Sequence, residues 1–316
     1  MIGFDIGGTK CAVCIGEEKE GELFVKDKRV IPTEHSISPY EMIDKMCDFA
    51  EKMTDNLDVI GISCGGPLDS EKGIIMSPPN LPGWDNIKIV DYIKGKYNVN
   101  AYLENDANAC AVAEWKYGAG KGTENMIFMT FGTGLGAGLI LDGKLYRGKN
   151  DMAGEAGHIR LNAFGPVGYG KAGSFEGFCS GSGIAQLGKM YAQEKLQMGK
   201  SVSFCGGFSN LENITAKSIA ECAYKGEQDA INIYETCGEM LGKGLSILID
   251  ILNPERIVLG SVFQRSESLL RPKMQEVLEK ECLAYSLDVC EVVPAKLGDN
   301  IGDYAALAIA AMNKEM

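Results

Sequence analysis

The sequence predicts an α/β protein with two lobes, and three observations lead to this prediction. Strand-like and helix-like segments alternate along the chain, which is typical of α/β folds. A unit of strand, glycine-rich loop and strand occurs twice, in residues 1–30 and in residues 126–146, with the loops about 125 residues apart. The 316 residues suffice for two lobes at roughly one domain per 150 residues.

The first half of the chain begins with three strands. IGFDI is joined by the turn GGTK to CAVCIG, and a charged turn leads to LFVK. A helix over residues 40–52 and a strand over residues 58–63 follow, and a loop rich in Gly and Pro comes next. A further helix is predicted from Ala107 to Trp115, ended by Gly118.

The second half repeats the opening pattern with MIFMTF, GTGLGAG and LILDGKLY, in which Asp142-Gly143 is a favoured hairpin turn. Residues 227–252 carry apolar side chains at helical spacing and end before Pro254. A strand is predicted over 257–259. A terminal helix over 304–312 is expected to pack back on the first lobe.

The composition excludes several classes of protein. With 31 Lys and Arg against 43 Asp and Glu, the formal charge is −12, which disfavours a nucleic-acid partner. No segment approaches the ~20 uninterrupted apolar residues of a membrane span. The N-terminus MIGFDIGGTK lacks the basic and apolar regions of a signal peptide. We therefore expect a cytoplasmic protein without a membrane partner.

The eleven cysteines are expected to be reduced and buried, because their number is odd and they are scattered within apolar runs. Cys11 and Cys14 form the one CxxC pattern, in a predicted strand. Side chains three apart on a strand point to opposite faces, so this pair cannot chelate one metal ion.

The loop that runs from Asp5 to Lys10 has the chemistry of a phosphate-binding turn. Gly7 and Gly8 allow backbone N–H groups to converge on an anion, and Thr9 adds a hydroxyl donor. Asp5 could hold Mg²⁺ through water beside bound phosphates. The alternative is a plain hairpin turn that requires positive φ.

The second glycine-rich loop contains Gly132, Thr133 and Gly134. It fails the dinucleotide pattern GxGxxG, because Leu139 occupies the last position and a hairpin follows instead of a helix. The stretch GAGKGT at 118–123 fails the Walker A pattern, because Gly122 follows the lysine. Neither of these nucleotide-binding folds fits.

Two polar motifs could carry chemistry. ENDANA at 104–109 follows a strand and opens a helix, so Asn105 or Asp106 could be an N-cap. Alternatively, Asp106 could accept a hydroxyl proton during phosphoryl transfer. GEAGH at 154–158 could grip adjacent hydroxyls of a polyol through Glu155 and His158, although a lone histidine is more often structural.

The combination of motifs resembles the ROK family of sugar kinases and sugar-responsive repressors. DIGGTK, the Gly-Gly-Pro turn at 65–67, PNLPGW at 79–84, ENDANA, FGTGLGAGLI at 131–140 and GEAGHI at 154–159 occur in this order. The resemblance spans nearly the whole chain. It implies the actin-like (RNase H-like) ATPase fold, with two α/β lobes around a central cleft that holds ATP and sugar, and a homodimer.

The resemblance also assigns roles to residues. Asp106 would be the catalytic base that takes the proton from the sugar 6-hydroxyl. Residues that would line the sugar site or bind its hydroxyls are Gly66, Asn80, Asn105, Asp106, Glu155, His158 and Glu176. Residues that would bind Mg²⁺ and ATP are Asp5, Gly7, Gly8, Thr9, Lys10, Gly132, Thr133, Gly134 and Gly260.

Two departures from the family pattern stand out. Family members commonly carry a zinc-binding CxCGxxGCxE run, but Gly168, Gly170 and Ser174 occupy the cysteine positions here. Zinc needs four ligands and only His158 remains, so we predict no structural zinc. Ser261 and Val262 follow Gly260 where the family usually has a triple-Gly turn beside the nucleotide, which leaves nucleotide preference open.

The leading hypothesis is an ATP- and Mg²⁺-dependent hexose 6-kinase with glucose as the default substrate. The alternatives are an N-acetylhexosamine kinase for N-acetylmannosamine or N-acetylglucosamine, and a non-catalytic sugar-sensing regulator. A repressor would carry a helix-turn-helix module before the first strand, and here that strand begins at Ile2. The expected lobes are 1–117 with about 299–316, and 118–298.

Overall fold

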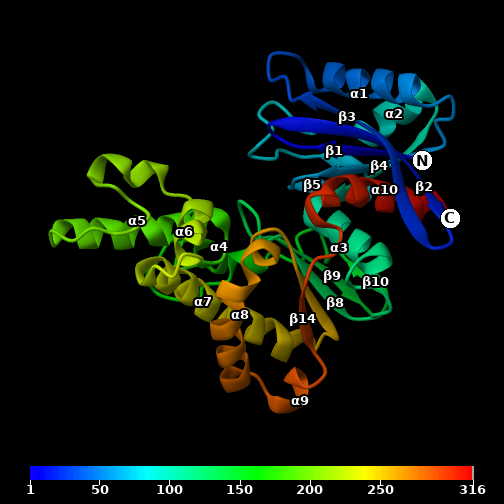
Figure 1. Ribbon diagram of the computed structural model, residues 1–316. Helices are drawn as coiled ribbons and strands as arrows, with labels where there is room; N and C mark the ends of the chain where they lie inside the picture. Colours follow the sequence, from blue (N-terminus) through cyan, green and yellow to red (C-terminus); the bar gives the residue numbers. More distant parts are fainter. Residues whose placement is uncertain (315–316) are drawn as a thin grey trace. The chain divides into compact units, whose positions relative to one another are not determined.

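Three antiparallel strands at the N-terminus begin the first sheet, as the sequence predicts. The computed structural model describes residues 1–314. The sheet has the order β3-β2-β1-β4-β7, with β4 and β7 parallel to β1 (Figure 1). Its strands are β1 (Ile2–Ile6), β2 (Lys10–Lys19), β3 (Glu22–Pro32), β4 (Val59–Cys64) and β7 (Asn100–Asn105). A small hairpin of β5 (Leu68–Asp69) and β6 (Ile74–Ile75) follows β4.

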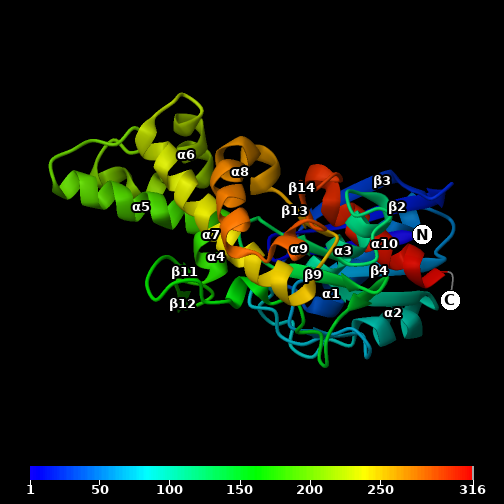
Figure 2. The ribbon, with the colours of Figure 1, turned by 90° about the horizontal axis from the view of Figure 1, so that it is seen from below.

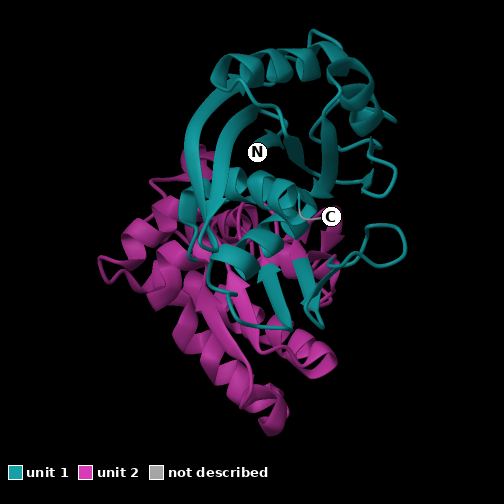
Figure 3. Cartoon of the chain, turned by 90° about the vertical axis from the view of Figure 1, so that its right-hand side faces the viewer, with its two compact units in different colours: residues 1–128, 138–154, 296–316 teal, residues 129–137, 155–295 magenta. Residues whose placement is uncertain are grey.

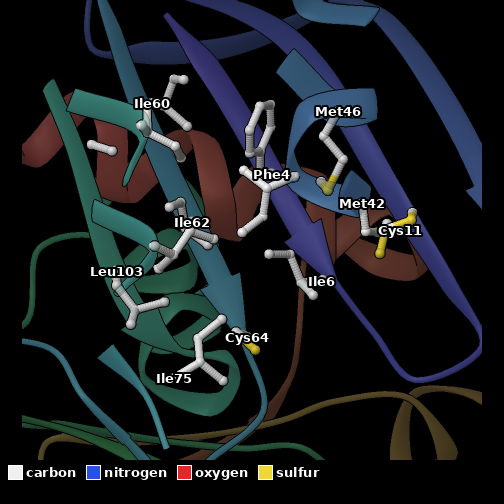
Figure 4. Close-up of a cluster of buried hydrophobic side chains, with 14 of the residues drawn as sticks. Phe4, Ile6, Cys11, Met42, Met46, Ile60, Ile62, Cys64, Ile75 and Leu103 are labelled. Carbon is white, nitrogen blue, oxygen red and sulfur yellow. The ribbon is translucent and has the colours of Figure 1, made fainter. Parts of the chain in front are cut away.

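Helices cover both faces of this sheet (Figure 1). One face packs on α1 (Pro39–Met53) and α2 (Ile89–Tyr97), and the other on α3 (Asp106–Tyr117) and α10 (Ile301–Lys314). Ser38 starts α1 with a capping box to Glu41. Figure 4 shows the core on the α1 side, where Phe4 of β1 and Met46 of α1 are fully buried. Their burial is the main source of stability here.

The terminal helix α10 packs closely on the sheet, as expected. A Cβ atom at Gly61 of β4 would lie 2.0 Å from the carbonyl oxygen of Ala306 and 2.4 Å from the backbone nitrogen of Ala310. Only glycine allows helix and strand to approach this closely. At the start of α10, a Cβ at Gly302 would lie 2.6 Å from Asp5 Oδ2, which places this end of the helix near the end of β1.

The second five-stranded sheet has the order β10-β9-β8-β13-β14. Its strands are β8 (Met126–Met129), β9 (Ala137–Leu141), β10 (Lys144–Tyr146), β13 (Arg256–Leu259) and β14 (Glu291–Pro294). Asp142 and Gly143 join β9 to β10 with φ of 52° and 66°, the left-handed pair that a tight type I′ hairpin requires. The predicted hairpin is confirmed.

The remaining helices belong to the second half of the chain. They are α4 (Phe175–Phe178), α5 (Gly181–Gln197), α6 (Ala216–Ala223), α7 (Gln228–Leu252), α8 (Val262–Glu281) and α9 (Ala284–Leu287), with a short hairpin of β11 (Val167–Gly168) and β12 (Lys171–Ala172). Helix α7 ends at Leu252, as predicted from the apolar spacing. It lies beside α8 (Figure 2), where a Cβ at Gly242 would be 2.6 Å from Val277.

The chain divides into two compact units (Figure 3). Unit 1 comprises residues 1–128 and 138–154 and the segment that begins at Lys296, and unit 2 comprises Met129–Ala137 and Glu155–Ala295. This grouping differs from the lobes expected from the sequence in that residues 118–128 and 138–154 fall in unit 1. Two mixed sheets, each with helices, confirm the α/β class. Among the helices of residues 1–314, none has the length and apolarity needed to cross a membrane.

Candidate functional site

The loop between β1 and β2 is a tight turn that extends from Asp5 to Lys10. The Gly7 nitrogen donates to the Lys10 carbonyl at 3.1 Å, and Thr33 Oγ1 donates to the Gly7 carbonyl at 2.6 Å. These bonds fix the backbone, while Thr9 and Lys10 remain exposed. An ordered turn with an exposed hydroxyl and an exposed ammonium group suits an anion such as phosphate.

Gly8 of this turn lies directly against Asn80. A Cβ at Gly8 would be 2.2 Å from the Asn80 carbonyl oxygen and 2.9 Å from its Cβ. The sequence assigned Gly8 to ATP and Asn80 to the sugar, and the structure brings the two residues together within unit 1. The requirement for glycine here comes from close approach of the backbone.

The Asp5 carboxyl sits among other acids at the end of β1. Burial, and to a smaller extent the neighbouring Asp303 and Asp106 carboxylates, raise its pKa to about 6. Lys28 donates to Asp303 at 2.6 Å and partly offsets this repulsion. A cation beside Asp5 would relieve this repulsion, so the Asp5 carboxyl suits a position next to a positively charged ligand.

Asn105 and Asp106 lie where β7 ends and α3 begins. Asn105 is the N-cap, and its Oδ1 accepts from the nitrogens of Ala107 and Asn108 at 3.0 and 3.4 Å. The side-chain nitrogen Nδ2 of Asn105 takes no part in these capping bonds. Asp106 is exposed, although the protein around its carboxyl raises the pKa by desolvation. A carboxylate that is accessible yet crowded by protein is a suitable base.

The Gly-Gly-Pro turn packs beside this pair. A Cβ at Gly66 would lie 3.3 Å from Asn105 Nδ2, and one at Gly65 would lie 3.9 Å from Asp106 Oδ2. Glycine at both positions keeps the space next to the Asn105 amide and the Asp106 carboxylate open. The structure thus brings Gly66, Asn105 and Asp106 together, as the sequence predicts.

The sequence did not predict the buried ion pair of Glu104 and Arg147, which supports the turn at Asn105 and Asp106. Glu104 is 1% exposed, and its Oε2 accepts from Arg147 Nε at 2.7 Å. Its Oε1 accepts from the Asn105 nitrogen and from Asn108 Nδ2, both at 3.0 Å. Burial raises the pKa of Glu104, and Arg147 lowers it. The two residues are 43 positions apart, so no local pattern could pair them.

In unit 2, the loop at Gly132–Gly134 is also a folded turn, with Gly132 donating to the Thr130 and Gly134 carbonyls at 2.8 and 3.1 Å. The Gly181 nitrogen donates to the Gly132 carbonyl at 2.7 Å. The Gly260 nitrogen donates to the Met129 carbonyl at 3.0 Å, which places Gly260 beside the strand that leads into the loop. The predicted ATP-binding residues of this unit therefore lie close together.

Glu176 contacts this same loop. Its Oε2 accepts from the Leu135 nitrogen at 2.9 Å and would be 2.6 Å from a Cβ at Gly134. A Cβ at Gly157 would be 2.1 Å from the Leu135 carbonyl oxygen and 3.3 Å from the Glu176 Cβ. The turn that carries Glu155 and His158, both exposed, is therefore packed against the glycine loop.

The segment in which relatives carry zinc-binding cysteines is instead a hairpin of β11 and β12. Lys171 Nζ donates to the His158 carbonyl at 2.7 Å, and Arg160 Nη1 donates to the Ala172 carbonyl at 2.7 Å. Ser174 is fully buried, and its Oγ caps α4 by accepting from the Gly177 nitrogen at 3.1 Å. A Cβ at Gly168 would lie 2.6 Å from that nitrogen, so a cysteine does not fit there.

These residues do not suit zinc, because soft thiolate ligands are absent and only His158 remains of the usual set. Within residues 1–314, no three His, Cys, Asp or Glu side chains are grouped to hold a metal ion. Hydrogen bonds and packing hold the hairpin, and with it the positions of His158 and Glu176.

The turn after β13 keeps a glycine-like backbone. Ser261 has φ of 46° and is the N-cap of α8, and its backbone nitrogen donates to Gln264 Oε1 at 3.0 Å. A serine is strained in this region, where the family usually has glycine. The Ser261 and Val262 side chains therefore occupy space beside Gly260 that glycines leave empty.

Comparisons with known proteins agree with the motifs. A family model described as "ROK family" matches residues 1–313. The chain is 29% identical over 313 residues to a glucokinase of Streptomyces coelicolor, which covers 98% of this chain and 96% of the relative. A xylose repressor of Caldicellulosiruptor bescii is 28% identical over 261 residues, 82% of this chain and 64% of the repressor.

A solved structure agrees as well. The ROK family glucokinase from Streptomyces griseus, in complex with glucose and AMPPNP, is 27% identical with a TM-score of 0.78 and covers 99% of both chains. This match confirms the expected actin-like fold of two α/β lobes. Because the family model matches all but the last three residues, the chain belongs to the ROK family.

Proposed function

We propose that this chain is an ATP-dependent hexose kinase that transfers the γ-phosphoryl group of ATP to the 6-hydroxyl of a hexose, with glucose as the default substrate. The observation that carries the proposal is the turn at Asn105 and Asp106, which presents an amide and a carboxylate beside the open Gly65–Gly66 turn. Its relatives include glucokinases that match nearly the full length of the chain.

Asp106 would accept the proton of the 6-hydroxyl as that oxygen attacks the γ-phosphorus and ADP leaves. Phosphoryl transfer through a loose transition state demands little base strength, so position matters more than basicity. The helix N-terminus fixes the carboxylate, because Ala107 donates to Asp106 Oδ1 at 2.8 Å. The raised pKa of Asp106 favours proton uptake once the transfer is complete.

The sugar would be held by the polar groups that the family resemblance assigns to it. Asn80, the Asn105 amide and the Gly66 backbone would bind hydroxyls, as would Glu155, His158 and Glu176. One oxygen of Glu176 already accepts from Leu135, so only the other is available to a sugar. Carboxylates and amides of this kind discriminate strongly against a sugar that lacks one hydroxyl, because a buried polar group then stays unpaired.

The phosphates of ATP would bind the turn of Gly7, Gly8, Thr9 and Lys10, and the turn of Gly132, Thr133 and Gly134 near Gly260. Asp5 suits Mg²⁺, because repulsion from Asp303 and Asp106 is already present around a partly buried carboxyl. One or two carboxylates together with substrate phosphates are the usual protein environment of Mg²⁺. When bound, Mg²⁺ would neutralise charge on the transferring phosphates.

An N-acetylhexosamine kinase is the second candidate for the substrate. The hairpin of β11 and β12, which replaces the zinc segment next to His158 and Glu176, leaves the choice between a hexose and an N-acetylhexosamine open. A different support for these two side chains allows a different sugar to fit. A sugar-sensing regulator of the family, as in the xylose repressor relative, is the third.

A sugar panel tests the proposal. ADP release should be measured with glucose, mannose, N-acetylglucosamine, N-acetylmannosamine and 6-deoxyglucose, and the product position should be read by ³¹P NMR. We expect turnover with a hexose, a 6-phosphate product and no turnover with 6-deoxyglucose. Sugar binding without ADP release would favour a regulator. Cell fractionation would test the expected cytoplasmic location, and sedimentation of the purified chain would test the expected homodimer.

A further inference from the structure

The loop over residues 147–153, which follows β10, contacts two segments of the candidate site within unit 1. At its start, Arg147 Nε donates to Glu104 Oε2 at 2.7 Å. Further along, Asp151 accepts two hydrogen bonds from Ser70, at 2.9 Å from its backbone nitrogen and at 2.7 Å from its hydroxyl. One short loop therefore joins segments that lie 43 and 81 residues away in the sequence.

The loop is folded so that these contacts have defined geometry. The Ala153 nitrogen donates to the Arg147 carbonyl at 3.1 Å and closes the loop. Gly148 and Asp151 have φ of 73° and 59°, both in the left-handed region. Asp tolerates this conformation better than most non-glycine residues, and the two bonds to Ser70 hold Asp151 in it.

The contact with Glu104 reaches Asp106 through the backbone. Glu104 is 1% exposed and accepts from Asn105 and Asn108, the residues on either side of the Asp106–Ala107 pair. Burial disfavours the charged form of Glu104, and the Arg147 guanidinium favours it. Arg147 therefore sustains the ionised carboxylate that holds the turn.

The contact with Ser70 acts on the Gly65–Gly66 turn, which faces Asn105 and Asp106. Ser70 directly follows β5. This strand begins immediately after Pro67, which itself follows the Gly65–Gly66 turn. That turn lies against the Asn105 amide and the Asp106 carboxylate. The two contacts of the loop thus hold the base and the backbone that faces it.

We propose that loop 147–153 is a positioning element for phosphoryl transfer, in which Arg147 places Asp106 through Glu104 and Asp151 places the Gly65–Gly66 turn through Ser70. The inference rests on the proposed function, because the kinase role of Asp106 is what makes its position matter. Neither Arg147 nor Asp151 contacts a substrate in this account. A displacement of about 1 Å can cost on the order of 100-fold in rate.

Four variants test the proposal. Arg147→Met combined with Glu104→Gln removes both charges together, which avoids a lone buried carboxylate that would unfold the chain. Arg147→Lys with native Glu104 keeps a cation at the contact. Asp151→Asn keeps a side chain that tolerates left-handed backbone and weakens the bonds to Ser70. Asn150→Ala, exposed in the same loop, is the matched control.

We expect kcat for the best sugar to fall about 10- to 100-fold in the double variant and about 3- to 10-fold in Asp151→Asn, with KM for sugar and ATP within about 3-fold of native. Arg147→Lys should recover part of the loss, and Asn150→Ala should match native. Amide hydrogen exchange should be faster at 104–108 in the double variant and at 65–70 in Asp151→Asn, with melting temperatures close to native.

The outcomes separate the two proposals. A native chain that turns over sugar, with native kcat in the double variant and in Asp151→Asn, overturns the positioning role and leaves the kinase function standing. A loss that appears in KM or melting temperature and not in kcat also overturns it, because it reports structural support alone. A native chain that phosphorylates no sugar overturns the proposed function, and the positioning role with it.

Discussion

Gly8 and Asn80 are in such close contact that a single methyl group at Gly8 would lie 2.2 Å from the Asn80 carbonyl oxygen. The obstacle is backbone, which cannot rotate away as a flexible side chain can. One residue is assigned to the phosphates of ATP and the other to the sugar, so the contact links the two proposed functions of unit 1.

Gly8→Ala should therefore weaken both functions at once. We expect kcat/KM for ATP and for sugar to fall at least about 10-fold, and the free energy of unfolding to fall by about 1–3 kcal/mol from overpacking. Gly95→Ala is the matched control, since a Cβ there has nothing within 4 Å and lies in α2. That variant should keep its activity and gain up to about 1 kcal/mol. Native kinetics in Gly8→Ala would contradict the assignment.

Asp5→Asn should stabilise the protein at neutral pH while it abolishes turnover. The folded pKa of Asp5 is raised from 3.8 to about 6, so its contribution to stability is complete below 3.8 and is lost as pH rises through 6. The difference in melting temperature between variant and native should be near zero at pH 4. It should grow towards pH 7, where the difference in the free energy of unfolding should reach on the order of 1–3 kcal/mol without Mg²⁺.

Thermal melts from pH 4 to 8, with and without Mg²⁺ and ATP, measure this difference. Mg²⁺ with ATP should raise the melting temperature of the native chain and have a smaller effect on Asp5→Asn. A variant that is less stable than native at pH 7 would contradict the proposed repulsion among Asp5, Asp303 and Asp106.

The hairpin of β11 and β12 should need no metal. Treatment with a zinc chelator, followed by transfer into Mg²⁺ buffer, should leave melting temperature and activity unchanged. Ser174→Ala should lower stability by about 1 kcal/mol, because the cap of α4 is lost. Stoichiometric, tightly bound zinc in the purified protein, measured by elemental mass spectrometry, would contradict the prediction that the hairpin needs no metal.

Glu114→Gln should be strongly destabilising. Glu114 is fully buried, and its carboxylate accepts from the backbone nitrogens of Ala119, Lys296 and Leu297 at 2.7–3.2 Å. An amide offers one acceptor oxygen and places its NH₂ group against these donors, so we expect a loss of about 2–4 kcal/mol by chemical denaturation. The exposed Glu51→Gln is the control, and an equal effect in both variants would refute the role of Glu114.

Local pattern was enough to predict much of this fold. The opening meander, the helix that ends before Pro254 and the Asp142-Gly143 hairpin are all confirmed, because each depends on spacing or turn chemistry within a few residues. The resemblance to the ROK family implied that Gly66, Asn105 and Asp106 share a site, and the structure places the three residues close together.

The supports of the candidate site could not be predicted in the same way. Arg147 and Glu104 are 43 residues apart, Lys296 and Glu114 are 182 apart, and Lys28 and Asp303 are 275 apart. No periodicity or turn signal connects such pairs, since only the tertiary fold brings them together. The hairpin of β11 and β12 could not be predicted either. The absence of the cysteines shows that the zinc ligands are missing, but it does not show which structure replaces the zinc site.

The most direct test of the central claim is the turnover of Asp106→Asn with the best sugar, followed by coupled ADP release and compared with native over pH 5–9. Asparagine has nearly the same shape and keeps an oxygen for the Ala107 nitrogen, so the turn should persist and sugar binding should change little. We predict that kcat falls by about 100- to 10,000-fold. A kcat within about 3-fold of native would show that Asp106 is not the base and would contradict the proposed mechanism.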